Sequence, residues 1–297
     1  MMQSVDAPAR ASVPAGAFLC LLAGGCAIAF APILVRLSDT GPVASAFWRT
    51  ALAAPLLWIF ALRGGARGGE AERAHWLALV AAGFFFAGDL GVWHWSIVWT
   101  SVANSTLLAN LAPIFVTLAG WLFWKRRVTR VFLAGMVVAI AGMFILVGPH
   151  FGTGGTQLLG DALGAITAVF YAGYMLAIKV ARDDGASTVR LMAWSTTITA
   201  LALLPIALLF PQPFMPVSLH GWLVVFGLAI ITQILGQGLI AYAFAHLPAS
   251  LSSVSLLIQP VVAAFLAWQL FGEPVGPAQF IGGAVVLAGI WIARRAS

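Results

Sequence analysis

Runs of about twenty mostly apolar residues recur along nearly the whole chain. A transmembrane α-helix needs a run of this length, because the hydrocarbon core of a bilayer is about 30 Å thick and each helical residue rises about 1.5 Å. No connecting segment is long enough to hold a soluble domain, so we expect an all-α integral membrane protein. The ten predicted transmembrane helices are 14–37, 42–62, 74–98, 102–124, 128–148, 158–181, 187–210, 219–245, 249–271 and 276–294.

The charged residues support this interpretation and predict an orientation. Only 8% of the residues are charged and 62% are hydrophobic, whereas a soluble domain carries about 25% charged residues. Of the 15 lysines and arginines, all but Arg36 and Arg49 lie at the chain ends or at the loops after even-numbered spans. Basic loops stay on the cytoplasmic side. We therefore expect both termini in the cytoplasm, a multi-pass protein of the inner membrane, and the lipid bilayer rather than nucleic acid as its surroundings.

The second half of the chain repeats the first at a shift of 147 residues. With five spans in each half, the second copy enters the membrane from the opposite side. We therefore expect two inverted five-helix repeats, 1–150 and 151–297, an architecture that many secondary transporters use for alternating access. Residues of unusual type coincide in the ungapped alignment: Gly91 with Gly238, Pro113 with Pro260, and Trp121 with Trp268.

Several of these segments resemble a known family. The stretches "WTSVANSTLLANLAPIFVTLAGWLF" and "HLPASLSSVSLLIQPVVAAFLAWQLFGEPVGPAQFIGGAVVLAGIWIAR" resemble the paired signatures of EamA-type members of the drug/metabolite transporter superfamily, and "FWRTALAAPLL" resembles their second helix, with Arg49 in the usual place. The aromatic-rich third span is similar to that of YddG-like exporters of aromatic amino acids. The resemblance implies a ten-helix carrier with two repeats that exports small metabolites, amino acids above all.

One position departs from the family pattern. Members often carry an acidic residue at the end of the fourth helix, where this chain has "WKRRV" and Arg126 aligns with Glu273 of the second half. If the acid has a gating role, only Glu273 supplies it here.

The third span places a carboxylate, a histidine and tryptophans at membrane depth in "GDLGVWHWS". Charged groups in hydrocarbon cost at least about 2.5–3.5 kcal/mol, so Asp89 is a candidate for proton coupling or for contact with a substrate amino group. The alternative is a structural partnership of Asp89 with Arg49 or with a helix-end carbonyl. Trp93, four residues on, shares the face of Asp89, whereas His94 does not. Both are candidate lining residues, although His94 also fits a satisfied interhelical donor and Trp93 an interfacial belt.

Polar residues and prolines recur on the fourth and ninth spans. A polar helix face in lipid must look inward, and a proline frees the backbone carbonyl four residues earlier. We expect the aligned Pro113 and Pro260 to break or kink their helices near a shared midplane, with a role in gating or in structure. The candidate substrate contacts on these two spans are Thr106, Asn110, Ser253 and Gln259.

Amides and phenols on two further spans complete the candidate site. Gln233 and Gln237 lie one turn apart on the eighth span, and Tyr171 and Tyr174 share a face of the sixth. Such groups bind a zwitterion without fixed charge, but they also join helices at about 1 kcal/mol per hydrogen bond.

No sequence motif indicates an enzyme. The chain has no GxxxxGK[ST], HExxH or GxSxG motif, and it has no filter-like ring of groups that would indicate a channel. We expect a secondary transporter without cofactor or metal, which exports small metabolites, above all neutral or aromatic amino acids, by alternating access around a central cavity. The alternatives are another solute, such as a nucleobase or a drug-like cation, or a non-transport membrane protein.

Overall fold

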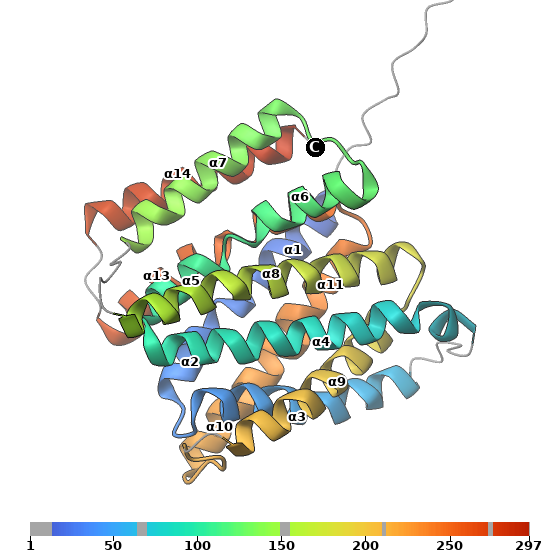
Figure 1. Ribbon diagram of the computed structural model, residues 1–297, viewed down its shortest axis with the longest axis vertical. Helices are drawn as coiled ribbons and strands as arrows, with labels where there is room; N and C mark the ends of the chain where they lie inside the picture. Colours follow the sequence, from blue (N-terminus) through green and yellow to red (C-terminus); the bar gives the residue numbers. More distant parts are fainter. Residues whose placement is uncertain (1–13, 64–69, 149–154, 210–211, 273–275, 297) are drawn as a thin grey trace, which may run out of the picture.

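The computed structural model describes residues 14–63, 70–148, 155–209, 212–272 and 276–296, and these residues form helices joined by short connections (Figure 1). The helices are α1 (Ala15–Ile28), α2 (Phe30–Leu37), α3 (Pro42–Arg63), α4 (Glu70–Trp99), α5 (Val102–Ala109), α6 (Ala112–Trp124), α7 (Arg130–Val147), α8 (Gly155–Asp183), α9 (Thr188–Leu209), α10 (Leu219–Gly227), the π-helix η1 (Leu228–Gln237), α11 (Gly238–Phe244), α12 (Ala249–Ser255), α13 (Ile258–Phe271) and α14 (Pro277–Arg295).

Ten helical segments in the described part of the chain are long and apolar enough to cross a bilayer, which confirms the predicted all-α membrane class. Four of them combine successive helices: α1 with α2, α5 with α6, α10 through η1 to α11, and α12 with α13. The ten segments are Ala15–Leu37, Pro42–Arg63, His75–Trp99, Asn104–Trp124, Arg130–Val147, Gly155–Asp183, Thr188–Leu209, Leu219–Phe244, Ala249–Phe271 and Pro277–Arg295.

The packing of the helices follows the sequence repeat. Three contacts join equivalent spans of the two halves: α3 packs on α9, α6 on α12, and α7 on α14. The third span packs on the sixth, through α4 and α8. The equivalent contact is that of the eighth span with the first, where η1 and α11 pack on α1. This reciprocal pattern is the one that two related five-helix units produce.

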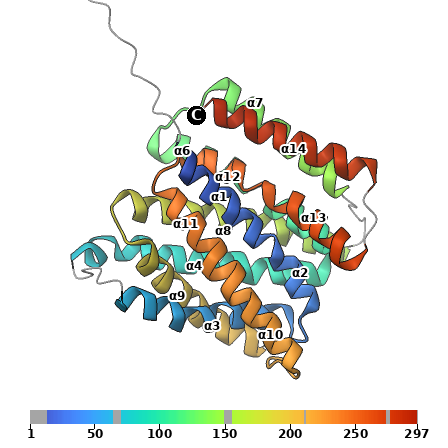
Figure 2. The ribbon, with the colours of Figure 1, turned by 180° about the vertical axis from the view of Figure 1, so that it is seen from behind.

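Helices α7 and α14 form one edge of the bundle in both views (Figures 1 and 2). Glycines let their backbones approach closely, as small residues do in membrane helix pairs. A Cβ atom added to Gly135 would lie 2.9 Å from the carbonyl oxygen of Gly289, and one added to Gly142 would lie 2.9 Å from that of Gly282. These four glycines allow the close backbone contact of the pair.

Three spans are interrupted near the middle of the bundle, each just before a proline. The breaks fall at Ala29 in the first span, at residues 110–111 in the fourth and at residues 256–257 in the ninth. Pro32, Pro113 and Pro260 cannot donate to the carbonyl four residues earlier, and their rings clash with it. The interruptions in the fourth and ninth spans were expected, whereas that in the first was not.

The eighth span contains a different irregularity. Its ten central residues form η1, and π-helical turns are rare and concentrate at functional sites. The segment packs closely on the first span, since Gly236 faces Ile28 and Gly24 approaches the carbonyl oxygen of Gly236.

Candidate substrate cavity

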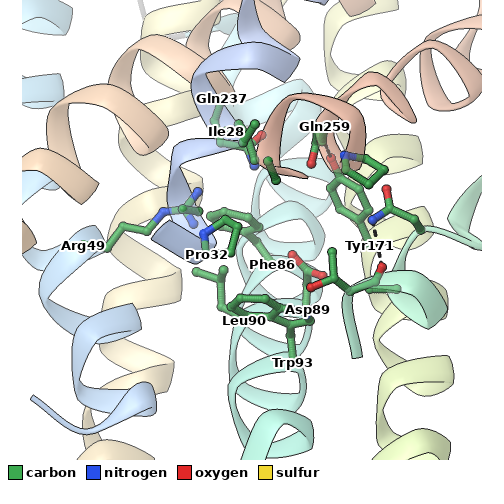
Figure 3. Close-up of a pocket in the computed structure, with 17 residues that line it drawn as sticks. Ile28, Pro32, Arg49, Phe86, Asp89, Leu90, Trp93, Tyr171, Gln237 and Gln259 are labelled. Atoms are coloured by element: carbon green, nitrogen blue, oxygen red, sulfur yellow. Dashed lines mark hydrogen bonds between the residues drawn. The ribbon is translucent and has the colours of Figure 1, made fainter. Parts of the chain in front are cut away.

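A cavity of about 100 Å³ lies among the interrupted helices (Figure 3). Seven of the ten spans contribute to its wall, and the edge pair α7 and α14 does not. The lining residues are Ile28, Ala29, Ala31, Pro32, Arg49, Phe86, Asp89, Leu90, Trp93, Thr106, Ala109, Asn110, Tyr171, Gln237, Gln259, Pro260 and Ala263.

Most of the residues singled out in the sequence come together at this cavity. They are Arg49, Asp89, Trp93, Thr106, Asn110, Tyr171, Gln237, Gln259 and Pro260. Four candidate contacts and one proline are not among the lining residues: His94, Pro113, Tyr174, Gln233 and Ser253. Glu273 lies outside the described residues.

The third span divides its polar groups between two faces. Asp89 and Trp93, one turn apart, both reach the cavity, whereas the His94 ring is 1% exposed and points elsewhere. The Nδ1 atom of His94 lies 2.6 Å from the carbonyl oxygen of Leu90, and its ring meets that of Trp93 edge-on at 4.7 Å. In this structure His94 therefore packs against the Trp93 ring and does not line the cavity.

A chain of hydrogen bonds fixes the one arginine of the cavity. The Nε atom of Arg49 on α3 donates to Oε1 of Gln233 on η1 at 3.0 Å, and Nε2 of Gln233 donates to the Thr196 hydroxyl at 3.0 Å. Both polar atoms of the buried Gln233 amide are thus used within the protein. Gln233 positions the guanidinium and does not itself face the cavity.

Stacked aromatic rings form the wall beside the amides. Tyr174 stacks on Phe86 with ring centroids 4.4 Å apart, and its hydroxyl donates to Oε1 of Gln237 at 3.3 Å. Nε2 of Gln259 donates to the Tyr171 hydroxyl at 3.3 Å. Tyr174 therefore holds a lining amide in place, while Tyr171 and Gln259 present a joined polar pair to the cavity.

The break in the fourth span exposes further polar groups. Nδ2 of Asn110 donates to the backbone carbonyl of Thr106 at 2.8 Å, and the backbone amide of Asn110 donates to the same carbonyl at 3.0 Å. The buried hydroxyl of Thr106 has no hydrogen-bond partner among the described residues. Ser253, by contrast, donates to the Ser250 carbonyl at 2.9 Å within its own helix.

An acidic and a basic side chain face this cavity from two helices. Figure 3 shows Arg49 of α3 and Asp89 of α4 extending toward it. In the described part of the chain, no hydrogen bond and no ion pair within 4 Å engages the Asp89 carboxylate. A carboxylate and a guanidinium kept apart at membrane depth are costly. A solute with an ammonium and a carboxylate group would compensate both.

Sequence reasoning missed the contribution of the first span. Ile28, Ala29, Ala31 and Pro32 line the cavity because the chain breaks at Ala29. The signal was the proline in "FAPILV", which stands inside an apolar run. Phe86 and Leu90 were missed because an apolar lining residue has the same pattern as a packing residue.

Comparison with solved structures supports the fold. One crystal structure superposes with a TM-score of 0.82 over 94% of this chain and 97% of the other, at 18% sequence identity.

Curated relatives are transporters. A probable terminal-alkyne amino-acid exporter of Streptantibioticus cattleyicolor is 29% identical over 272 residues, 91% of this chain and 89% of the relative. The pseudopaline exporter CntI of Pseudomonas aeruginosa is 26% identical over 275 residues, 92% of this chain and 93% of the relative. An uncharacterised transporter of Archaeoglobus fulgidus is 27% identical over 196 residues, 66% of this chain and 68% of the relative.

The family model matches this chain twice, over residues 15–148 and 158–295. The two matches together cover all ten membrane-length helices, apart from the first three residues of the sixth. This chain is a multi-pass membrane protein and belongs to the EamA-like transporter family.

Proposed function

We propose that the protein exports a small zwitterion, a neutral amino acid or a close analogue, across the inner membrane by alternating access around the central cavity. The observation that carries the proposal is the pair of opposite charges, Arg49 and Asp89, on separate helices of one cavity. A solute carboxylate would lie against the guanidinium and a solute ammonium against the Asp89 carboxylate. Charge-assisted hydrogen bonds of this kind are about twice as strong as neutral ones.

The remaining wall suits an apolar side chain. Phe86, Leu90 and Trp93 lie beside Asp89, and aromatic faces contribute large apolar contact areas. The cavity volume of about 100 Å³ is small beside the roughly 300–1,000 Å³ of drug-sized sites. This size favours a small aliphatic amino acid, and an aromatic side chain would require the cavity to open further.

The names of the relatives support export as the direction of transport. Two of them are named as exporters, one of a terminal-alkyne amino acid and one of pseudopaline. We infer export of an amino-acid-like solute for this chain from that similarity together with the charged pair.

The test is counterflow of labelled L-norvaline in liposomes that contain the purified protein. Unlabelled norvaline is compared with n-butylamine, which lacks its carboxylate, and with pentanoate, which lacks its ammonium. Glycine, alanine, methionine, phenylalanine and tryptophan then test size. We expect norvaline to compete far better than either single-charge analogue. Equal competition by butylamine would instead indicate a carrier of organic cations, and no flux with any compound would exclude this substrate class.

A further inference from the structure

A second cavity, of about 80 Å³, lies nearer one end of the bundle and has no part in the site described above. Helices α6, α8 and α12 and the connection after α6 build it. Its charged residues are Arg126, Lys179 and Asp183, its hydroxyls are those of Thr117 and Ser250, and Trp124 forms part of its wall.

The two cavities are in line along shared spans. At about 1.5 Å per residue, Thr117 lies about 10 Å beyond Asn110 on the fourth span and Lys179 lies about 12 Å beyond Tyr171 on α8. Ser250 precedes Gln259 on the ninth span by about 13 Å. All three displacements point to the same end of the bundle, whose basic loops predict that it is cytoplasmic. Between the cavities α12 carries Ser252, whose buried hydroxyl has no hydrogen-bond partner in the described part of the chain.

The charged residues that line this cavity have a net positive charge. The Lys179 ammonium is 2.5 Å from the Asp183 carboxylate and donates to the Phe244 carbonyl at 3.0 Å. Arg126 also lines the cavity, and among the described residues its side chain has no hydrogen bond or ion pair. The charges of Lys179 and Asp183 cancel, so Arg126 leaves the cavity with a net positive charge. A positive cavity favours a ligand that carries a carboxylate.

The backbone at the end of α6 brings Arg126 to this wall. Lys125 adopts a left-handed conformation with φ 50°, the one positive φ among non-glycine residues in the described part of the chain. The next amide, that of Arg126, donates to the Gly120 carbonyl at 3.0 Å, so the chain turns back over the helix end. The aligned position in the second repeat is Gly272, with φ 66°. The same left-handed turn thus ends the equivalent helix in both repeats, and only in the first repeat does a residue other than glycine adopt it.

We propose that this cavity, defined by Arg126, Lys179, Asp183 and Trp124, is a second binding site for a carboxylate-bearing solute, which occupies it before it reaches the central cavity. The identity of the solute as a zwitterion rests on the proposed function. Arg126 and Lys179 bind the carboxylate, and Asp183 receives the ammonium group. Arg126, which aligns with Glu273 of the second repeat, thus recruits solute at the entrance.

The charge of the cavity is tested without any substrate. In a Cys20→Ser, Cys26→Ser background, Ser250→Cys is treated in phosphatidylcholine nanodiscs with an anionic and with a cationic methanethiosulfonate of similar size. We expect the anionic reagent to react faster. Arg126→Gln should lower the ratio of the two rates about fivefold, whereas Arg127→Gln, on the same loop but outside the cavity, should leave it unchanged. An equal effect of the two arginines, or no preference for the anion, would overturn the proposal. Thr117→Cys replaces Ser250→Cys if the latter does not fold.

Protection then tests occupancy. L-norvaline should slow the reaction of Ser250→Cys, and should still do so when Asp89→Asn disables the central cavity. No protection, or protection lost with Asp89→Asn, would overturn a separate site. Protection by phosphatidylglycerol but not by norvaline would assign the cavity to a lipid phosphate and overturn the proposal as well. Norvaline protection without norvaline counterflow would instead contradict the proposed function and leave the second site standing.

Discussion

The guanidinium of Arg49 on α3 is bonded to the side-chain oxygen of Gln233 on η1 at 3.0 Å. The amide of Gln233 continues to Thr196 on α9, so a single buried side chain connects three helices at the wall of the cavity. The orientation of the cavity's arginine therefore depends on the π-helix. If η1 changes its winding during transport, Arg49 changes its bond as well.

Replacement of Gln233 should reduce transport through Arg49. Gln233→Leu leaves the buried Nε–H of Arg49 without an acceptor, which costs about 1–3 kcal/mol, and frees the guanidinium to bond Asp89. We expect norvaline counterflow to fall at least tenfold while pure folded protein is still obtained. Thr196→Val, which removes only the outer bond, should have a smaller effect. Unchanged counterflow in Gln233→Leu would show that Arg49 needs no positioning.

Asp89→Asn separates the transport role of the carboxylate from a structural one. The amide keeps the shape of the side chain but loses its charge. We expect weaker norvaline transport or an altered response to a pH gradient, with a folded yield close to that of the parent. Both quantities are measured on the same preparation, by gel filtration and by counterflow. A variant that fails to fold, or that folds and transports as the parent does at every pH, would assign Asp89 to structure.

Much of this fold follows from the sequence, because span length and helix breaking are local properties. The ten spans and the breaks before Pro113 and Pro260 needed only hydropathy and the chemistry of proline. The π-helix could not be predicted in this way, and neither could the contact of Gly24 and Ile28, from another span, with Gly236 of this helix. The helical spacing placed Trp93 with Asp89 and His94 apart from them. It gave no means of telling that Gln233 is used within the protein while Gln237 reaches the cavity.

The glycine contacts between α7 and α14 predict a loss of stability without a direct effect on the cavity. Gly142→Ala places a Cβ 2.9 Å from the Gly282 carbonyl oxygen, and overpacking of this kind costs about 1–3 kcal/mol. We expect a lower unfolding temperature in detergent. Gly16→Ala is the matched control, because nothing lies within 4 Å of its added Cβ. A pair of variants with equal unfolding temperatures would contradict the close backbone contact.

Lys125→Gly tests whether the left-handed turn after α6 is strained. Glycine adopts positive φ without steric cost, so the substitution should raise stability, or leave it unchanged, by relieving strain of about 1 kcal/mol. It removes one basic residue but keeps the turn that carries Arg126. Norvaline counterflow should therefore persist, and the anionic preference at Ser250→Cys should remain. Lys125→Ala keeps the strain and serves as the control. A clear loss of stability in Lys125→Gly would show that the lysine side chain, rather than the turn, matters here.

A loop contact at the opposite end of the bundle should be sensitive to pH. Oδ2 of Asp39 accepts hydrogen bonds from the Ser218 hydroxyl at 2.7 Å and from its amide at 3.1 Å, and these bonds hold the pKa of the Asp39 carboxyl below its usual value. A lowered pKa in the folded state stabilises the protein above the unfolded pKa of about 4, and this stabilisation is lost as the pH falls through the folded pKa.

We therefore expect Asp39→Asn to lower the unfolding temperature at pH 7, and the difference from the parent to shrink as the pH is lowered from 5 toward 3. Ser218→Ala should show the same trend, because it removes the hydroxyl partner, and the double variant should add little. A difference that stays constant over this range would mean that the charged form of Asp39 contributes nothing to holding the connection of α2 and α3 against the N-terminus of α10.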